Sequence, residues 1–294
     1  MRDEKLSFRQ RVRQGQRLLG SFAFLASPTV VEILGRAGLD FVIIDQEHSP
    51  KSWEVVENMV SAAELCGMAA LVRVARNEEK EILHALEVGA AGIMVPFVET
   101  AEDVRCAASA LRYAPDGTRG TCTQTRAAGF GGNRSSFVEF ARQRNEELLL
   151  IGLIENRKGL DNIGEIAAVD NGLDVVFIGR SDLASDLGRA GQSGDPLVEA
   201  ATEKIRDATL AAGAQVGLAQ YSAAECELWG SRGCTFFAFP SESGLLFDAA
   251  SALKRDVAAR WDAIDKPGEN NHAGNAQVAI AVTPPGRRPR AVSK

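Results

Sequence analysis

Short runs of apolar residues alternate with amphipathic stretches along most of the chain. This alternation is typical of parallel α/β architecture, in which helices separate buried strands. The segment 52–67 predicts one such helix, with Ser52 as its N-cap and Gly67 just past its end. The apolar runs predict eight strands, over residues 18–25, 40–45, 69–74, 91–96, 148–155, 173–179, 214–219 and 234–239.

Eight strand–helix units in about 250 residues match the size and rhythm of a (β/α)₈ TIM barrel. A doubly wound sheet would show the same alternation, and the pattern alone does not exclude it. The chain has no G-x-G-x-x-G after its first strand, which weighs against that second fold. We expect residues 1–265 to form a single barrel domain. Residues 266–294 are rich in proline, glycine and asparagine and predict a disordered tail.

Composition narrows the classes of function. The net charge is −6, and no long basic run precedes the C-terminal segment, so nucleic acid is not an expected partner. The five cysteines form no C-x-x-C pair, which argues against a disulfide framework and a structural zinc site. The charged N-terminus and the lack of 18 consecutive apolar residues predict neither a signal peptide nor a membrane span. We therefore expect a cytoplasmic protein.

The segment 112–133 interrupts the alternation. It is rich in glycine, threonine and arginine and is too long for an ordinary connection. Long structured loops often carry function, so the sequence predicts an active-site loop here.

Polar side chains stand at the ends of four predicted strands, and in a barrel those ends meet at one rim. These side chains are Asp45, Glu47, His48, Arg73, Glu155 and Asp182. Glu155 and Asp182 are separated by a whole crossover, so their carboxylates can meet only at that rim. Two oxygen ligands with open positions suit Mg²⁺ or Mn²⁺. Glu47 fits either a supporting role there or a solvent-facing position.

Six motifs in order resemble the HpcH/HpaI family of class II pyruvate aldolases. They are IDQEHSP, LVRV, GIMVPFVETAEDV, RYAPDGTRG, LIENRKG and VFIGRSDLASDLG. The resemblance covers roughly residues 15 to 262, and the ordered set is far more specific than any single motif.

The resemblance implies a TIM barrel of the phosphoenolpyruvate/pyruvate type and a divalent metal ion: Mg²⁺, Mn²⁺ or Co²⁺. By this resemblance Glu155 and Asp182 are the metal ligands, His48 with Asp45 is the acid/base dyad, and Arg73 is the cation over the pyruvate oxygen. It also implies a homo-oligomer, a hexamer or trimer, whose final helix docks on a neighbour. The substrate-binding residues expected around the site are Arg73, Gly179, Arg180, Ser181 and Arg119.

These residue types suit aldol cleavage of a 4-hydroxy-2-oxo acid to pyruvate, or a related 2-oxo acid, and an aldehyde. Arg73 would stabilise the enolate oxygen, and His48 would remove the proton of the 4-hydroxyl group. No lysine stands at a predicted strand end, which separates this mechanism from Schiff-base aldolases. The other two histidines, His84 and His272, are expected to be structural or solvated.

The chain departs from the family pattern near the expected site. Leu153 stands where many members have glutamine, and Arg180 stands where a proline is usual. Gln46, Glu87 and the segment FPSES after the eighth predicted strand also differ. The metal end of the pocket is therefore expected to be intact and the substrate end altered.

Two other functions stay open at this point. One is an acyl-CoA lyase similar to citrate lyase β subunits and malyl-CoA lyases, which share the barrel and the paired carboxylates; the His48 motif argues against it. The other is a barrel that binds a 2-oxo acid without catalysis, which the apolar Leu153 near the metal ligands would permit.

Overall fold

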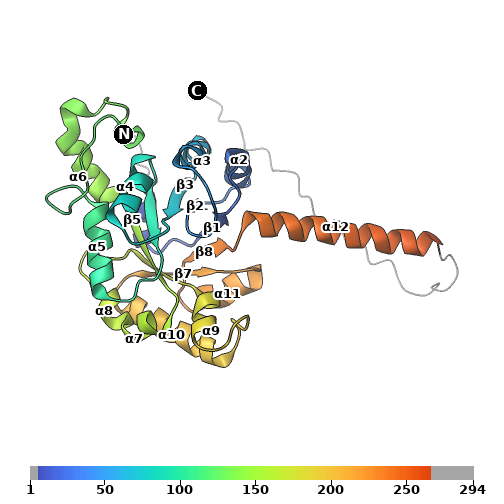
Figure 1. Ribbon diagram of the computed structural model, residues 1–294. Coiled ribbons are helices and arrows are strands. Elements are labelled where there is room, and N and C mark those ends of the chain that lie inside the picture. Colours follow the sequence, from blue (N-terminus) through green and yellow to red (C-terminus); the bar gives the residue numbers. More distant parts are fainter. Residues whose placement is uncertain (1–5, 266–294) are drawn as a thin grey trace, which may run out of the picture. The chain divides into compact units, whose positions relative to one another are not determined.

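The computed structural model describes residues 6–265 (Figure 1). Its strands are β1 (Leu18–Ala23), β2 (Phe41–Asp45), β3 (Ala69–Arg73), β4 (Gly92–Val95), β5 (Leu149–Ile154), β6 (Val175–Ile178), β7 (Gln215–Ala219) and β8 (Phe236–Phe239). Each coincides with one of the eight predicted apolar runs. The predicted tail, residues 266–294, lies outside the described residues.

Helices follow the strands in the order expected from the sequence. The α-helices are α1 (Phe8–Arg13), α2 (Pro28–Arg36), α3 (Trp53–Leu65), α4 (Glu79–Glu87), α5 (Ala101–Leu111), α6 (Phe137–Glu147), α7 (Arg157–Asp161), α8 (Ile163–Ala167), α9 (Arg180–Asp186), α10 (Pro196–Ala211), α11 (Ala223–Ser231) and α12 (Glu242–Asp265). Two short 3-10 turns, η1 (Arg126–Ala128) and η2 (Arg134–Ser136), lie between α5 and α6.

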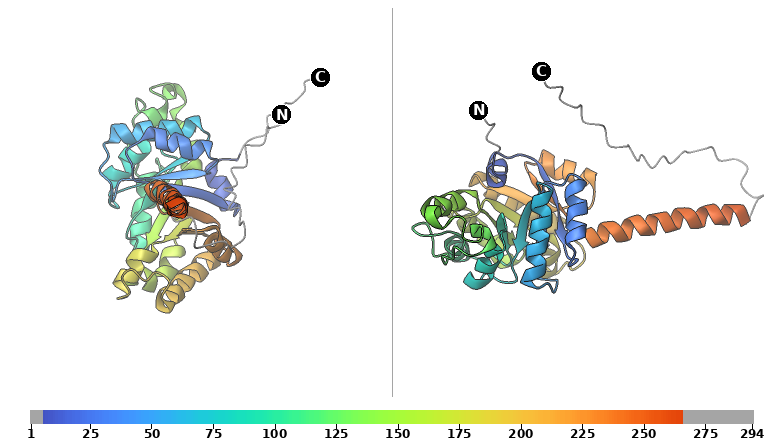
Figure 2. Two further views of the ribbon diagram at one scale, coloured as in Figure 1. Left: turned by 90° about the vertical axis from the view of Figure 1, so that its right-hand side faces the viewer. Right: turned by 90° about the horizontal axis from the view of Figure 1, so that it is seen from above.

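The eight strands close into a parallel barrel in sequence order. Leu18 of β1 pairs with Phe236 of β8, which joins the first strand to the last. Figure 2 shows the strands inside a layer of helices. The predicted TIM barrel is confirmed, and the doubly wound alternative is excluded because an open sheet has two unpaired edges.

Local sequence explains where the helix after β2 begins and ends. The hydroxyl of Ser52 accepts the main-chain N–H of Val55 and caps α3. Gly67 follows with φ of +70°, a left-handed conformation that glycine adopts without steric cost. Both predicted boundary residues are confirmed.

Two apolar layers hold the barrel together. The inner layer fills the space enclosed by the strands, where the rings of Phe41 and Phe236 stack with centroids 4.1 Å apart. The outer layer lies between the strands and their helices and contains small and branched residues such as Val42, Ile44 and Val176. Strands buried on both faces read as continuous apolar runs, which explains why the sequence showed runs instead of strict alternation.

The short helix α1 closes the end of the barrel at which the strands begin. The ring of Phe8 lies 5.9 Å from that of Phe41. Arg9 Nε donates to both carboxylate oxygens of Asp174, each at 2.9 Å. Asp174 also accepts from Arg13 Nε at 2.7 Å and from the main-chain N–H of Leu150 at 3.0 Å. A buried carboxylate is thereby saturated with donors.

The long segment 112–133 does not lie at the rim of its own chain that was predicted for it. It connects α5 to α6 and β5, so it belongs to the end of the barrel where strands begin. Arg119 within it is buried: its Nη2 donates to Glu87 Oε1 at 2.6 Å, and its guanidinium lies 4.3 Å from the ring centroid of Tyr113. The loop lies opposite the predicted rim of its own chain, because loop length and composition do not reveal on which side of a crossover a loop lies; its functional role stays a prediction.

The described chain divides into two compact units, with the boundary between Phe247 and Asp248 inside α12. The barrel lies entirely in the first unit. No helix among residues 6–265 is long and apolar enough to cross a membrane.

Candidate active site

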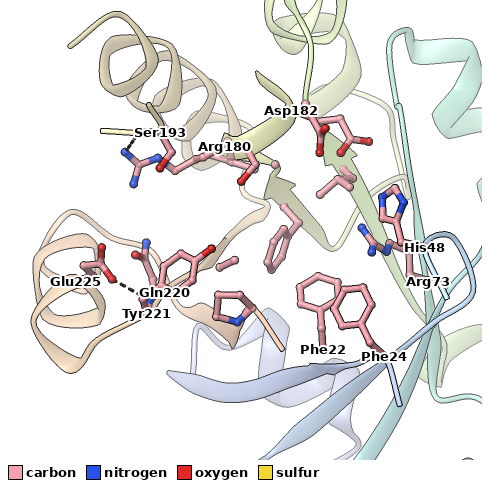
Figure 3. A pocket seen from close by; sticks show the side chains of 18 residues that line it. Phe22, Phe24, His48, Arg73, Arg180, Asp182, Ser193, Gln220, Tyr221 and Glu225 are labelled. Carbon is pink, nitrogen blue, oxygen red and sulfur yellow. Dashed lines mark hydrogen bonds between the residues drawn. The ribbon is translucent and has the colours of Figure 1, made fainter. Parts of the chain in front are cut away.

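A cavity of about 230 Å³ opens at the carboxyl ends of the strands. Of the predicted site residues, His48, Arg73, Glu155, Gly179, Arg180, Ser181 and Asp182 line it. Figure 3 shows His48, Arg73 and Asp182 together on one side of this space. Asp45 is fully buried directly behind Arg73, and Arg119 does not line the cavity.

Arg73 is the last residue of β3 and is held from two sides. Its Nε donates to Asp45 Oδ1 at 2.6 Å, and its Nη1 lies 3.1 Å from Glu47 Oε2. The guanidinium carbon lies 5.0 Å from the ring centroid of Phe22, a cation–π distance. Because these contacts fix the long side chain, Arg73 presents its charge to the cavity with little remaining freedom.

Asp45 organises the loop that carries His48. Its carboxylate accepts the main-chain N–H groups of Glu47 at 3.2 Å and His48 at 2.9 Å, in addition to Arg73 Nε. The predicted contact between Asp45 and the imidazole is absent among the hydrogen bonds of the described chain. Instead, His48 Nε2 lies 3.6 Å from Glu47 Oε2, and the imidazole is largely exposed. The oxygens of Asp45 are occupied by Arg73 and the loop amides, which leaves Glu47 as the carboxylate beside the imidazole.

Glu47, whose position the sequence left undecided, contacts both Arg73 and His48. Burial raises the pKa of its carboxyl group, Asp45 and Asp182 add to the rise, and Arg73 and His48 oppose it. The residue lies between the cation of Arg73 and the imidazole, so it can orient both.

Glu155 follows β5 and is 4% exposed. Its Oε1 accepts the main-chain N–H of Phe97 at 2.8 Å. Burial raises the pKa of Glu155 to about 8, and the nearby carboxylates of Glu47 and Asp182 contribute to the rise. A side chain at Gly179 would collide with Glu155, because an added Cβ would lie 2.7 Å from the Glu155 Cβ. Glycine at this position thus leaves room for the carboxylate.

Asp182 was predicted in the loop after β6 and instead lies in the first turn of α9. It lines the same cavity as Glu155 and lies near enough for its charge to act on that carboxyl group. The hypothesis that a crossover brings these two residues to one rim agrees with their positions.

The donor set fits a hard divalent cation. Within residues 6–265 no three His, Cys, Asp or Glu side chains form a metal-binding cluster, so a fully protein-coordinated ion is not indicated. Two carboxylates that share a cavity leave coordination positions to water and substrate, as Mg²⁺ and Mn²⁺ prefer. A cation would also offset the burial of Glu155.

Several cavity residues escaped the sequence analysis. Phe22 and Phe177 form apolar walls, and Gln220 and Tyr221 follow β7. Their position after a strand was the available signal, but a lone glutamine or tyrosine there has no motif. Leu153, identified from the sequence as a departure, is 3% exposed and also lines the cavity.

His84 and Lys51, the other basic groups considered, do not line the cavity. The His84 ring lies 5.5 Å from that of Trp53, on α4 and away from the cavity. Lys51 Nζ donates to the carbonyl of Asp45 at 2.6 Å, and the residue does not line the cavity. No lysine lines the cavity formed by the described residues, consistent with an aldolase that does not form a Schiff base. His272 lies outside the described residues.

Known proteins are similar to this chain in sequence and in fold. Residues 18–239 match the family model described as HpcH/HpaI aldolase/citrate lyase. The chain is 33% identical over 235 residues to a 5-keto-4-deoxy-D-glucarate aldolase of Escherichia coli O9:H4 (strain HS), covering 80% of this chain and 90% of the relative.

Two solved structures support the same relationship. A HpcH/HpaI aldolase/citrate lyase family protein from Burkholderia cenocepacia J2315 superposes with a TM-score of 0.80 at 30% identity, covering 85% of this chain and 98% of the other. A HpcH/HpaI aldolase from Desulfitobacterium hafniense DCB-2 gives a TM-score of 0.80 at 27% identity, with coverages of 86% and 97%. The chain therefore belongs to the HpcH/HpaI aldolase family of metal-dependent class II aldolases, which are carbon–carbon lyases.

Proposed function

We propose that the chain catalyses reversible aldol cleavage of a 4-hydroxy-2-oxo acid to pyruvate, or a related 2-oxo acid, and an aldehyde. The observation that carries this proposal is the common cavity of Arg73, His48 and the carboxylate pair Glu155 and Asp182. The name of the Escherichia coli relative supports an oxo-sugar acid as the class of substrate.

Each residue has a role that its position supports. Glu155 and Asp182 would hold Mg²⁺ or Mn²⁺, which when bound acts as a Lewis acid toward the 2-oxo group. Arg73 donates to the oxygen on C2 as negative charge develops there, and its ion pairs with Asp45 and Glu47 keep it in place. His48 accepts the proton of the 4-hydroxyl group while the C3–C4 bond breaks and its electron pair moves toward C2.

Asp45 and Glu47 act through these groups. Asp45 fixes Arg73 and the main chain of the His48 loop, whereas Glu47 lies beside the imidazole. We therefore assign Asp45 a positioning role and replace the expected dyad by a pairing of His48 with Glu47. At 3.6 Å from His48 Nε2, the Glu47 carboxylate can orient the imidazole toward the cavity.

The test is deuterium exchange at C3 of pyruvate, followed by proton NMR with Mg²⁺ or Mn²⁺ present. Exchange reports enolate formation and needs no knowledge of the aldehyde. We expect exchange in the wild-type chain, loss of exchange after treatment with EDTA, and recovery on adding the metal back. Full exchange in metal-stripped protein would contradict the class II mechanism.

Variants make this test specific. Asp182→Asn should abolish exchange, while Asp186→Asn, on the same helix but outside the cavity, should leave it unchanged. Arg73→Ala should lower exchange and cleavage together. A non-catalytic binding barrel would show no exchange at all, and an acyl-CoA lyase would show a thermal shift with coenzyme A esters that pyruvate does not produce.

We also infer that the protein forms a homo-oligomer through α12. A largely apolar groove of about 520 Å³ lies on the barrel unit between α11 and the paired strands β8 and β1. Its lining includes Leu18, Leu19, Cys226, Phe237 and Phe239. The part of α12 that lies in the second unit carries exposed apolar residues: Leu253, Trp261 and Ile264. We assign the groove to α12 of a second copy, because burying both surfaces removes apolar area from water.

Light scattering tests this assignment. Wild-type protein should have the mass of a trimer or hexamer, and Leu253→Ser combined with Trp261→Ser should lower it. An unchanged mass in the double variant would contradict the role of α12.

A further inference from the structure

The cavity has a second end, away from the carboxylate pair. Figure 3 shows Arg180 and Ser193 on one wall of this end and Gln220, Tyr221 and Glu225 on the facing wall. The chemistry proposed above uses none of these residues. Two of these side chains, Arg180 and Gln220, carry buried donor groups without a hydrogen-bond partner among residues 6–265.

Arg180 is a cation without a carboxylate partner in the described chain. Its Nη2 donates to the carbonyl of Ser193 at 2.5 Å, and its guanidinium lies 5.5 Å from the ring centroid of Trp229. Its Nε is buried and donates to no group among residues 6–265. A half-buried guanidinium held only by a carbonyl and a ring retains its positive charge toward the cavity.

Neighbouring charges do not neutralise Arg180 by direct contact. Arg232 lies over the same indole at 4.8 Å, but it forms ion pairs with Glu199 at 3.0 Å and Glu203 at 3.1 Å. Glu225 directs its Oε2 to the main-chain N–H of Tyr221 and to the Ser222 hydroxyl. Glu199 and Glu225 act on Arg180 only through the longer-range field.

Gln220 supplies a second unpartnered donor. It is 2% exposed, follows β7 directly and lines the cavity. Its amide nitrogen is buried and finds no hydrogen-bond partner within residues 6–265. Buried amide groups are normally hydrogen-bonded, so a glutamine at this place calls for an acceptor from outside the chain.

We propose that Arg180 and Gln220 form an acceptor subsite that binds a carboxylate at the far end of the aldehyde. The proposal rests on the aldolase function proposed above and names its class of acceptor: an aldehyde with a terminal carboxylate. The aldehyde carbon then lies toward His48 and Arg73, and the carboxylate takes hydrogen bonds from the guanidinium and the amide.

Steady-state kinetics of the aldol addition tests the subsite, with pyruvate as donor. The acceptors are succinic semialdehyde and its methyl ester, which have the same carbon chain but differ in charge. The wild-type chain should prefer the acid. Arg180→Gln and Gln220→Leu should each lower kcat/KM for the acid about tenfold or more and change kcat/KM for the ester less than about threefold, since a hydrogen bond to a charged group is worth about one to two factors of ten.

Three further measurements keep the outcome interpretable. Arg232→Gln is the matched control, because Arg232 shares the Trp229 ring but does not line the cavity, and it should keep the wild-type preference. Gln220→Glu should reject the acid more strongly than Gln220→Leu, because it adds a negative charge. Circular dichroism verifies that each variant is folded.

Pyruvate deuterium exchange separates this proposal from the one on which it rests. Normal exchange in Arg180→Gln, together with a lost preference for the acid, supports the subsite. Normal exchange with equal losses for acid and ester, or with no loss for either, overturns it and leaves the aldolase function standing. Absence of exchange in the wild-type chain overturns the aldolase function itself.

Discussion

The two ends of the barrel differ in how many hydrogen-bond donors surround a buried carboxylate. At the end closed by α1, Asp174 receives donors from Arg9, Arg13 and the main chain of Leu150. At the open rim, the one donor that residues 6–265 supply to Glu155 is the main-chain N–H of Phe97, and burial raises the pKa of Glu155 to about 8. One carboxylate is saturated by the protein, and the other is left short of positive partners.

This contrast separates stability from function. A saturated carboxylate has no capacity for an external ligand, whereas an undersaturated one gains free energy when a cation arrives. Charged residues at strand ends therefore cannot be interpreted from burial alone. Their unmet hydrogen-bonding and charge requirements distinguish a candidate site from a structural ion pair.

The largest expected effect comes from removing the charge of the undersaturated carboxylate. Glu155→Gln should reduce pyruvate exchange by about 1000-fold, since a Lewis acid contributes several kcal/mol to the developing charge. The melting temperature of the metal-free protein should not fall, because the glutamine carbonyl can still accept the main-chain N–H of Phe97. Exchange by NMR and thermal melts measure the two quantities. A large loss of stability would place Glu155 in the same class as Asp174.

The reverse pattern is expected at the closed end. Asp174→Asn should lower the free energy of unfolding by about 3–5 kcal/mol, because Arg9 and Arg13 lose their buried partner. Urea denaturation measures this loss, and exchange per folded molecule should stay normal. Glu139→Gln, which breaks an exposed pair with Arg142, is the matched control and should have no measurable effect. If Asp174→Asn and Glu155→Gln had equal effects on the free energy of unfolding and on exchange, the contrast between the two ends would be refuted.

Replacing His48 should separate cleavage of the C3–C4 bond from formation of the enolate. His48→Ala is expected to lower aldol cleavage about 100-fold, at the low end of the range for general acid–base catalysis, and to affect exchange less. His84→Ala, on α4 and outside the cavity, serves as control. Cleavage is followed by coupling pyruvate release to a dehydrogenase. If cleavage persisted at the wild-type rate, the general-base role would be lost.

The smallest effect concerns the helix after the His48 loop. Ser52→Ala should cost about 1 kcal/mol of unfolding free energy, the usual value of an N-cap. Ser52→Asp should restore most of it, because aspartate also caps. Chemical denaturation measures both variants. A loss in the serine-to-alanine variant that aspartate does not restore would point to a role other than capping.

The sequence predicted the strands and the rim, because buried parallel strands leave long apolar runs and their polar ends stand out. Glu155, Asp182, Arg73 and His48 were found in this way, and all four line the cavity. Arg119 was predicted at this rim but lies at the end where the strands begin and pairs with Glu87, so its substrate-binding role stays a prediction. The sequence also could not show which carboxylate lies beside which cation. Asp45 accepts from Arg73 and from the loop amides, and Glu47 is the carboxylate beside the imidazole of His48.

The contacts of α1 determine when this helix can dock on the barrel during synthesis of the chain. Arg9 and Asp174 are 165 residues apart, so α1 emerges from the ribosome long before its carboxylate partner. The ring contact between Phe8 and Phe236 likewise forms only after the last strand has been synthesised. The first helix synthesised can therefore complete its contacts only after nearly the whole barrel has been made. Docking of α1 is accordingly expected as a late step of folding.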